Sequence, residues 1–275
     1  PMPKVHGTAI LEGEIELADD VEIGPGCILC GPIRIGAGTR MMARATLQGP
    51  LVIGEGNLIW PGVCLGMAPQ SARFDPFEPG PGVVVGDHNS FREQVTIHRA
   101  THATDPTRIG NRNYFMVGSH AGHDVVVGNG CTFANGSLLG GHAVIEDGAI
   151  TGGNSAVHQF VRVGAGSMIS GGTAISLDLM PHFMVTATNF AGSLNLVGLR
   201  RKGATLAEIE AVRWVYKTIC RDGLGLRAAT ERLRQRADDP TIARYLEFIA
   251  KSKRGLVTRH GREGSDRARS ADMAV

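Results

Sequence analysis

The stretch that decides the fold runs from Ile109 to Leu139 and reads IGNRNYFMVGSHAGHDVVVGNGCTFANGSLL. An apolar residue recurs in it at every sixth position, and the spacing continues to Ile175 with one polar break. The sites are Ile109, Phe115, Ala121, Val127, Phe133, Leu139, Ile145, Thr151, Val157, Val163, Ile169 and Ile175. A period of six fits neither a helix nor an alternating strand. It is typical of a hexapeptide β-helix, in which each unit forms one short side of a coil.

The same period organises the chain from its beginning. Its earlier sites are Val5, Leu11, Leu17, Ile23, Leu29, Ile35, Met41, Leu47, Ile53, Ile59 and Leu65. The next clear site is Val85, and the surplus residues, within Gly66–Gly82, include four prolines. We therefore predict a loop that leaves the coil at about residues 66–84. A second, shorter excursion is predicted at residues 99–108, because Ile109 returns in phase.

Helical signals follow the repeat. Residues 182–203 are irregular, and Thr205 to Glu208 then form a capping box that opens a helix. A second helix is predicted at 226–236, and a third begins at Asp239-Pro240 and ends near Gly255. We expect a β-helix domain at 1–185, an α-helical domain at 186–256 and a disordered tail at 257–275.

The composition narrows the class of protein. There are 38 glycines, which suit tight corners, and a net charge of +2, which gives no case for nucleic acid. The five cysteines include one CxxC, Cys27 to Cys30, with no second pair, so we interpret them as buried small residues. No signal peptide or apolar stretch of membrane length is found, which favours a cytoplasmic enzyme without stable membrane insertion.

Coil geometry gathers the polar residues into one patch. Three sides of six residues make a coil of about 18, so residues 18 apart stack on neighbouring coils about 4.8 Å apart. The stacked columns are Gly122, Gly140 and His158; His123, Gly141 and Gln159; and Asp124, His142 and Phe160, with His120 beside them. We predict that this patch is the functional site. The other histidines, among them His98 and His102, are interpreted as surface residues.

The patch suits general-base chemistry. A neutral histidine has a pKa near working pH, and the N–H of Gly141 can meet a developing oxyanion. Asp124 follows His123 directly and could orient its ring, although neighbours on a strand usually point apart. No Ser or Cys lies in the patch, so direct transfer is favoured over a covalent acyl-enzyme.

Three motifs carry a resemblance to a known family. They are His120-Ala-Gly-His123-Asp124, Gly140-Gly141-His142 and Ala156-Val157-His158-Gln159-Phe160. With them the chain, from about residue 5 to 256, resembles the acyl-[acyl-carrier-protein]–UDP-N-acetylglucosamine O-acyltransferases. Those enzymes take the first step of lipid A synthesis. The resemblance implies a left-handed parallel β-helix with a C-terminal α-helical domain, a homotrimer with active sites between subunits, and acyl carrier protein as partner.

The resemblance also implies roles. It matches His123 to the general base, Gly141 to the oxyanion donor, and His142 and His158 to supporting histidines. The positions that hold the nucleotide sugar are His120, Gln159, Asn195, Arg201 and Lys202, and Gly171 gauges acyl length. The reaction moves a 3-hydroxyacyl group from the carrier's phosphopantetheine thioester to the glucosamine 3-hydroxyl of UDP-N-acetylglucosamine. No metal and no further organic cofactor is implied.

The chain departs from the family pattern at three substrate contacts. Aligned through Gln70, itself expected to contact substrate, the family's loop Asp and Lys become Ser71 and Arg73. The Glu expected two residues after Asn195 is Val197. These changes keep the chemistry and leave open a 3-amino UDP-sugar as acceptor.

Other interpretations stay open at this stage. A zinc enzyme of the same fold, such as a γ-class carbonic anhydrase, would use imidazoles from His120, His123, His142 and His158. An N-acyltransferase of the sister family would carry an extra N-terminal domain. A scaffold without activity is the third alternative.

Overall fold

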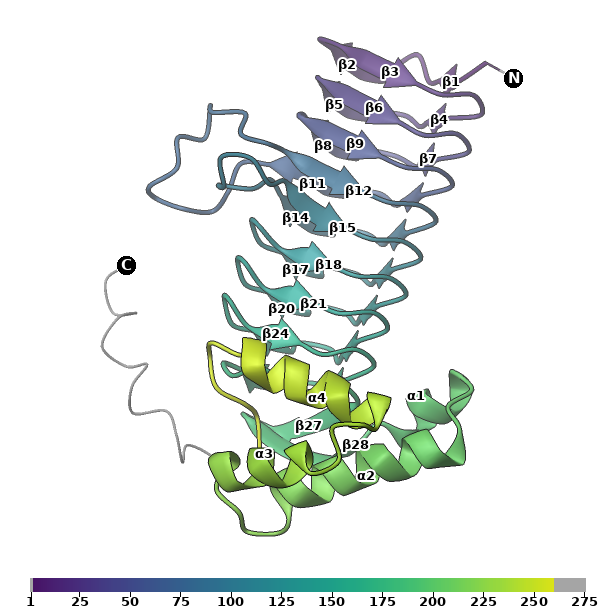
Figure 1. The fold of residues 1–275 in the computed structure, drawn as a ribbon. Coiled ribbons are helices and arrows are strands. Elements are labelled where there is room, and N and C mark those ends of the chain that lie inside the picture. Colours follow the sequence, from purple (N-terminus) through teal and green to yellow (C-terminus); the bar gives the residue numbers. More distant parts are fainter. Residues whose placement is uncertain (1, 260–275) are drawn as a thin grey trace.

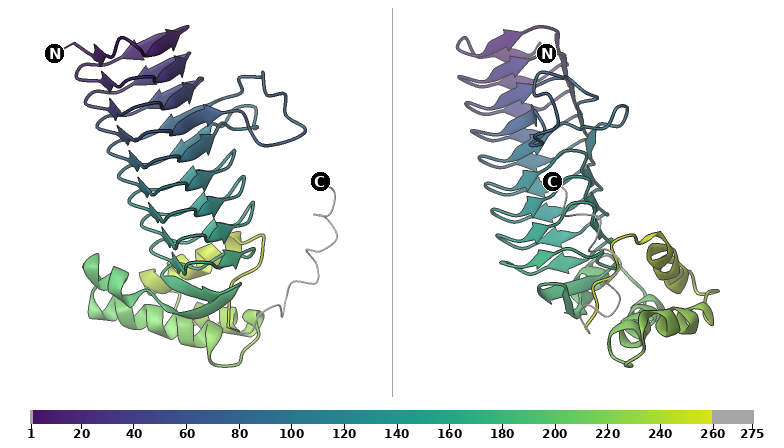
Figure 2. Two further views of the ribbon diagram at one scale, coloured as in Figure 1. Left: turned by 180° about the vertical axis from the view of Figure 1, so that it is seen from behind. Right: turned by 90° about the vertical axis from the view of Figure 1, so that its left-hand side faces the viewer.

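The structure is a computed structural model that describes residues 2–259. Its main body is a column of stacked coils with helices gathered at one end (Figures 1 and 2). Each coil contributes one short strand to each of three sheets, which are parallel apart from one antiparallel pair at the end of the first. The fold class predicted from the six-residue period, a β-helix of hexapeptide repeats followed by α-helices, is confirmed.

The strands are grouped by sheet. The first sheet holds β1 (Lys4–Val5), β4 (Glu22–Ile23), β7 (Arg40–Met41), β10 (Leu58–Ile59), β13 (Ser90–Phe91), β16 (Tyr114–Phe115), β19 (Thr132–Phe133), β22 (Ile150–Thr151), β25 (Met168–Ile169), β27 (Phe183–Ala187) and β28 (Phe190–Leu194). The second holds β2 (Ile10–Glu12), β5 (Ile28–Cys30), β8 (Thr46–Gln48), β11 (Cys64–Met67), β14 (Thr96–His98), β17 (His120–Ala121), β20 (Leu138–Leu139), β23 (Ala156–Val157) and β26 (Ala174–Ile175). The third holds β3 (Ile15–Leu17), β6 (Ile33–Ile35), β9 (Leu51–Ile53), β12 (Val83–Val85), β15 (Thr107–Ile109), β18 (Val126–Val127), β21 (Val144–Ile145) and β24 (Arg162–Val163).

The strand register places residues 18 apart on neighbouring coils. His120 pairs with Leu138, and Leu138 pairs in turn with Ala156. From Ile23 onward the repeat sites are buried and form the core, and Thr151, the polar break, is also fully buried, whereas Val5 and Leu11 on the first coil are exposed. Phe115 packs between Phe91 and Phe133, with ring centroids 5.3 and 4.4 Å away. The apolar period therefore marks the residues that fill the narrow interior.

Two loops leave the column on the same side of the coil. The external loop, residues 68–82, connects β11 to β12, a little shorter than the predicted 66–84, and projects from the column in Figure 1. The predicted second excursion connects β14 to β15 over residues 99–106. Both loops follow neighbouring strands of the second sheet, so they emerge from adjacent coils.

The C-terminal part contains more than the predicted helices. They are present as α2 (Leu206–Cys220), α3 (Leu226–Arg234) and α4 (Pro240–Lys251), and the Thr205–Glu208 capping box forms. Residues 182–203, expected to be irregular, form the antiparallel hairpin β27–β28 and the short helix α1 (Leu196–Arg201). The sequence missed the hairpin because its two five-residue strands do not follow the six-residue period. The expected domain boundary at 185/186 falls inside β27.

The first residues of the expected disordered tail are ordered on the protein surface. Val257 is fully buried, and Thr258 bridges to Phe190 in β28. Residues 257–259 therefore pack on the protein, because the hairpin offers them a free strand edge. The rest of the predicted tail, 260–275, lies outside the described residues.

Two further expectations were that the cysteines are buried small residues and that no segment inserts stably into a membrane. All five cysteines are free thiols, and Cys27, Cys131 and Cys220 are buried, whereas Cys30 and Cys64 are partly exposed. None of the helices within residues 2–259 is long and apolar enough to cross a membrane.

We predict that Phe115→Ala lowers the free energy of unfolding by about 3–5 kcal/mol, because it removes the middle ring of a fully buried stack. Urea denaturation followed by circular dichroism measures this change. Val117→Ala on the neighbouring corner is the control, since Val117 is exposed. Equal losses in the two variants would contradict the assignment of the core.

Candidate active site

The predicted patch lies on a polar pocket of about 370 Å³. We call the patch itself the histidine corner. It comprises residues 122–124, 140–142 and 158–160, where three successive coils turn from the second sheet to the third. The pocket is lined by Gln70, His98, His120, Gly122, His123, Gly140, Gly141, His158 and Gln159. Side chains from the corner, from β14 and β17 and from the external loop thus converge on one space.

His123 and Asp124 contact each other directly. They stand in a turn, where Asp124 adopts a positive φ of 60°, and His123 Nδ1 lies 2.6 Å from Asp124 Oδ2. The expectation that neighbours point apart is wrong here, because that rule holds for strand residues. A carboxylate only accepts, so Nδ1 carries the proton and Nε2 is left to accept one.

Asp124 is held as an anion by its surroundings. Burial acts to raise the pKa of this carboxyl, but hydrogen bonds outweigh burial and hold the pKa well below its usual range. The donors are His123 Nδ1, the N–H and hydroxyl of Thr101 and the N–H of His102. Thr101 and His102 belong to the second excursion. This loop therefore fixes the carboxylate that orients His123.

His142 stands behind His123 and does not line the pocket. Its Nε2 lies 3.5 Å from Asp124 Oδ2, and its ring meets the edge of the His123 ring at 5.2 Å. The His142 ring also stacks on the Phe160 ring, with ring centroids 4.5 Å apart. Burial lowers the pKa of His142, although Asp124 opposes this. His142 thus supports the His123–Asp124 pair from outside.

The glycines of the corner leave room for the histidine and for a ligand. A Cβ added to Gly141 would lie 2.8 Å from His123 Nε2, and one added to Gly122 would lie 2.9 Å from the Gly141 nitrogen. Any other residue would therefore collide with the ring or cover the amide. Among residues 2–259, the Gly141 N–H has no hydrogen-bond acceptor. It is a free donor beside His123.

His98 is a pocket residue that sequence analysis placed on the surface. It is buried, its Nδ1 lies 2.5 Å from the carbonyl oxygen of Ala68, and its ring meets the His120 ring at 5.2 Å. Burial lowers the pKa of His98 and lowers that of His120 to about 4. Both rings are therefore neutral near pH 7. The available signal was the position of His98 at the start of the second excursion.

His158 and Gln159 line the opposite wall. His158 Nδ1 lies 3.2 Å from the Gln159 carbonyl oxygen and 3.3 Å from Nη2 of Arg254, which follows α4. The helical part of the chain therefore touches the pocket through Arg254.

Several predicted substrate residues lie outside this pocket. Ser71 and Arg73 stand in the external loop just beyond Gln70. Asn195 caps α1, with its amide oxygen accepting from the Gly198 N–H and its amide nitrogen donating to the Gly166 carbonyl. Arg201 and Lys202 are exposed at the end of α1, and Lys202 Nζ approaches the Asp147 carbonyl. None of these five residues lines the histidine pocket.

Gly171 lies on another corner. It stands between β25 and β26, where the chain turns from the first sheet to the second, whereas His123 stands between the second and the third. A Cβ added to Gly171 would lie 3.2 Å from the Gly153 carbonyl oxygen.

The geometry leaves one candidate metal cluster within the described chain. Ligand atoms of His123, Asp124 and His142 lie within 4.8 Å of one another. A metal there would compete with the hydrogen bonds that already occupy Asp124 and with the His123 Nδ1 proton. His120 and His158, the other imidazoles of the zinc interpretation, are not in this cluster.

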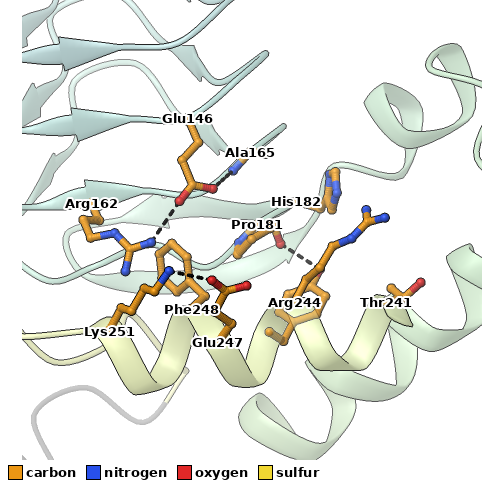
Figure 3. A pocket seen from close by; sticks show the side chains of 11 residues that line it. Glu146, Arg162, Ala165, Pro181, His182, Thr241, Arg244, Glu247, Phe248 and Lys251 are labelled. Atoms are coloured by element: carbon orange, nitrogen blue, oxygen red, sulfur yellow. Dashed lines mark hydrogen bonds and ion pairs between the residues drawn. The ribbon is translucent and has the colours of Figure 1, made fainter. Parts of the chain in front are cut away.

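A second cavity, of about 280 Å³, lies between the last coils and α4 (Figure 3). Its charges are mostly paired internally, Arg162 with Glu146 and Lys251 with Glu247. The Arg162 guanidinium also stacks over Phe248. The Arg162–Phe248 contact and the hydrogen bond from the Tyr245 hydroxyl to the Pro181 carbonyl dock α4 on the last coils.

Comparisons with known proteins agree with this geometry. Residues 106–141 match the bacterial transferase hexapeptide family, and residues 178–257 match domain 2 of the UDP-N-acetylglucosamine O-acyltransferases. A protein of Syntrophobacter fumaroxidans named acyl-[acyl-carrier-protein]–UDP-N-acetylglucosamine O-acyltransferase is 38% identical over 92% of this chain and 99% of its own. A Campylobacter concisus protein of the same name is 31% identical, over 95% and 100%.

Solved structures give the same result. The UDP-N-acetylglucosamine acyltransferase of Francisella novicida superposes with a TM-score of 0.88 at 31% identity, covering 94% of this chain and 95% of that one. The UDP-N-acetylglucosamine O-acyltransferase of Moraxella catarrhalis reaches 0.85 at 35% identity, over 92% and 99%.

The coil and its glycine-lined histidine pocket define a transferase of the hexapeptide-repeat class. Within that class, the chain belongs to the acyl-[acyl-carrier-protein]–UDP-N-acetylglucosamine O-acyltransferase family.

We predict that His120 makes the protein less stable at low pH. Its pKa is about 4 in the folded protein, against the ordinary value of 6.5 in the unfolded chain, so the unfolded chain binds more protons between these pH values. Stability is therefore complete above pH 6.5 and is lost as the pH falls toward 4. In His120→Gln the loss from about pH 7 to about pH 4.5 should be smaller by on the order of 2 kcal/mol. Urea unfolding at both pH values measures it, and identical losses in parent and variant would refute the prediction.

Proposed function

We propose that this protein transfers a 3-hydroxyacyl group from acyl carrier protein to the 3-hydroxyl of UDP-N-acetylglucosamine, the first step of lipid A synthesis. The observation that carries the proposal is the His123–Asp124 contact of 2.6 Å beside the free Gly141 N–H. The substrates are inferred from the relatives, whose names give both donor and acceptor.

The pocket provides each group that the transfer needs. His123 Nε2 removes the proton from the sugar 3-hydroxyl, whose oxygen attacks the thioester carbonyl carbon. The Gly141 N–H donates to the oxyanion, the C–S bond breaks, and the leaving thiolate takes up the proton. Asp124 stabilises the imidazolium formed on the way. His142 supports this pair, and His120, His158, Gln159 and Gln70 surround the acceptor sugar.

The remaining predicted residues require more than one chain. In this proposal the enzyme is a homotrimer, and a neighbouring subunit brings Asn195, Arg201 and Lys202 to the nucleotide. Those residues do not line the histidine pocket of their own chain, and Arg201 and Lys202 are exposed. Gly171 likewise gauges acyl length from a groove between subunits. Exposed cations at Lys217 and Arg221, close to α1, suit an acidic carrier protein. No cofactor acts beyond the donor's phosphopantetheine.

One alternative is the same chemistry on a 3-amino UDP-sugar. It is favoured by the departures from the family pattern at Ser71, Arg73 and Val197. We expect a mass-spectrometric assay with 3-hydroxyacyl carrier proteins of several chain lengths to give product on UDP-N-acetylglucosamine. The 3-amino analogue is offered beside it, and the preferred acyl length is read from the same spectra. Product only on the amino sugar would reassign the acceptor.

Activity that disappears after dialysis against a chelator and returns with zinc would favour the metal-site interpretation.

We predict that His123→Ala lowers kcat by about 10²–10⁴-fold, because it removes the general base. Asp124→Asn should lower kcat less, since the ring remains but loses the carboxylate that orients it. Circular dichroism and size-exclusion chromatography check that both variants keep the parental fold and assembly. Near-parental turnover in His123→Ala would refute the assignment of the base.

A further inference from the structure

Arg99 is a fully buried cation at the start of the second excursion. It is 1% exposed, and among residues 2–259 no carboxylate forms an ion pair with it. A buried guanidinium is costly unless its donors are satisfied. Here backbone carbonyl oxygens satisfy them, and all of those carbonyls belong to the external loop or to the strand from which it leaves.

The contacts of Arg99 join the two limbs of the external loop, the leaving limb that follows β11 and the returning limb that leads to β12. Nη1 donates to the Gly66 carbonyl, 3.1 Å away, where the chain leaves β11. Nη2 donates to the carbonyls of Pro76 and Glu78, at 2.7 and 2.8 Å, on the returning limb. Nε also reaches Glu78, at 3.2 Å. One side chain therefore closes the loop by binding both of its ends.

The leaving limb is held at two further points by the same dipeptide. The Arg99 N–H donates to the Met67 carbonyl, and His98 Nδ1 lies 2.5 Å from the Ala68 carbonyl oxygen. Gln70, two residues later, lines the histidine pocket. The position of Gln70 thus depends on contacts made by His98 and Arg99.

The loop has little else to hold it. Residues 75–80 are all exposed, and Phe77 is 91% exposed. Hydrogen bonds inside the loop connect near neighbours, such as the Phe77 N–H to Asp75. Arg99 is thus the one side chain in the described structure that donates to both limbs.

We propose that Arg99 is a positioning residue that holds the external loop against the histidine pocket and thereby sets affinity for the acceptor sugar. This inference rests on the proposed function for the identity of the sugar. The Arg99 side chain donates only to carbonyls of β11 and the external loop, whereas the donors that hold Asp124 come from Thr101 and His102. Loss of Arg99 should therefore weaken binding of the sugar while His123 keeps its geometry.

Arg99→Met tests the proposal, because it keeps a long apolar side chain and removes every donor. We expect the KM for UDP-N-acetylglucosamine to rise about tenfold or more while kcat stays within about threefold of the parent. Chymotrypsin should cut the chain at Phe74 or Phe77 at least about tenfold faster, because the loop opens more often. The fragments are identified by mass. Arg99→Lys keeps the charge but not the fork of donors, so smaller changes of the same kind are expected.

Phe115→Leu is the matched control, a core change in the first sheet, whereas the external loop connects the second sheet to the third. It should lower Tm without raising KM or loop cleavage. Parental KM and cleavage in folded Arg99→Met, or in Arg99→Lys if the methionine variant fails to fold, would overturn the proposal, as would an equal KM rise in Phe115→Leu. If the parent transfers no acyl group, the proposed function fails, and the cleavage rates still report whether Arg99 holds the loop.

Discussion

The structure depends on the hydrogen-bonded stacking of coils that are about 18 residues long. Each coil strand, two to four residues long, is too short to be stable alone, and it persists because its backbone pairs with the coils above and below. This pairing demands that each six-residue side place one apolar side chain inward, as Phe115 and Phe133 do. The corners need no inward apolar side chain, so polar residues can occupy them. The stacking of successive coils then brings these polar residues together.

The site uses this freedom at a single corner. Gly122 and Gly140–Gly141 keep the corner narrow, so the His123 ring lies against backbone and beside a free N–H. Asp124 adopts a left-handed turn conformation that aims its carboxylate back at the preceding histidine. A regular strand could not make this contact between consecutive residues. The general base is therefore oriented by local backbone geometry, and the rigid coils fix its distance from Gly141.

Two insertions complete what the coil cannot supply. The second excursion surrounds Asp124 with donors and keeps it ionised. The external loop brings Gln70 to the pocket and is tied to its neighbour through His98 and Arg99. The regular repeat thus provides rigidity, and the irregular segments provide groups at angles that a three-sided coil does not offer. The end of β14 and the start of the second excursion serve both purposes, because His98 and Arg99 hold the external loop and Thr101 and His102 hold Asp124.

The sequence by itself determined the β-helix, its core and the stacking of His123, Gly141 and Gln159, because a strict period encodes which residues face inward and which lie one coil apart. It also predicted α2, whose capping box is a local signal. Only the tertiary structure decided the β27–β28 hairpin, the burial of Arg99 and the entry of His98 into the pocket. These features depend on contacts between segments with no period in common, such as His98 with Ala68. These side chains meet their partners only after the coils have stacked, so the spacing of residues along the chain does not predict the contacts.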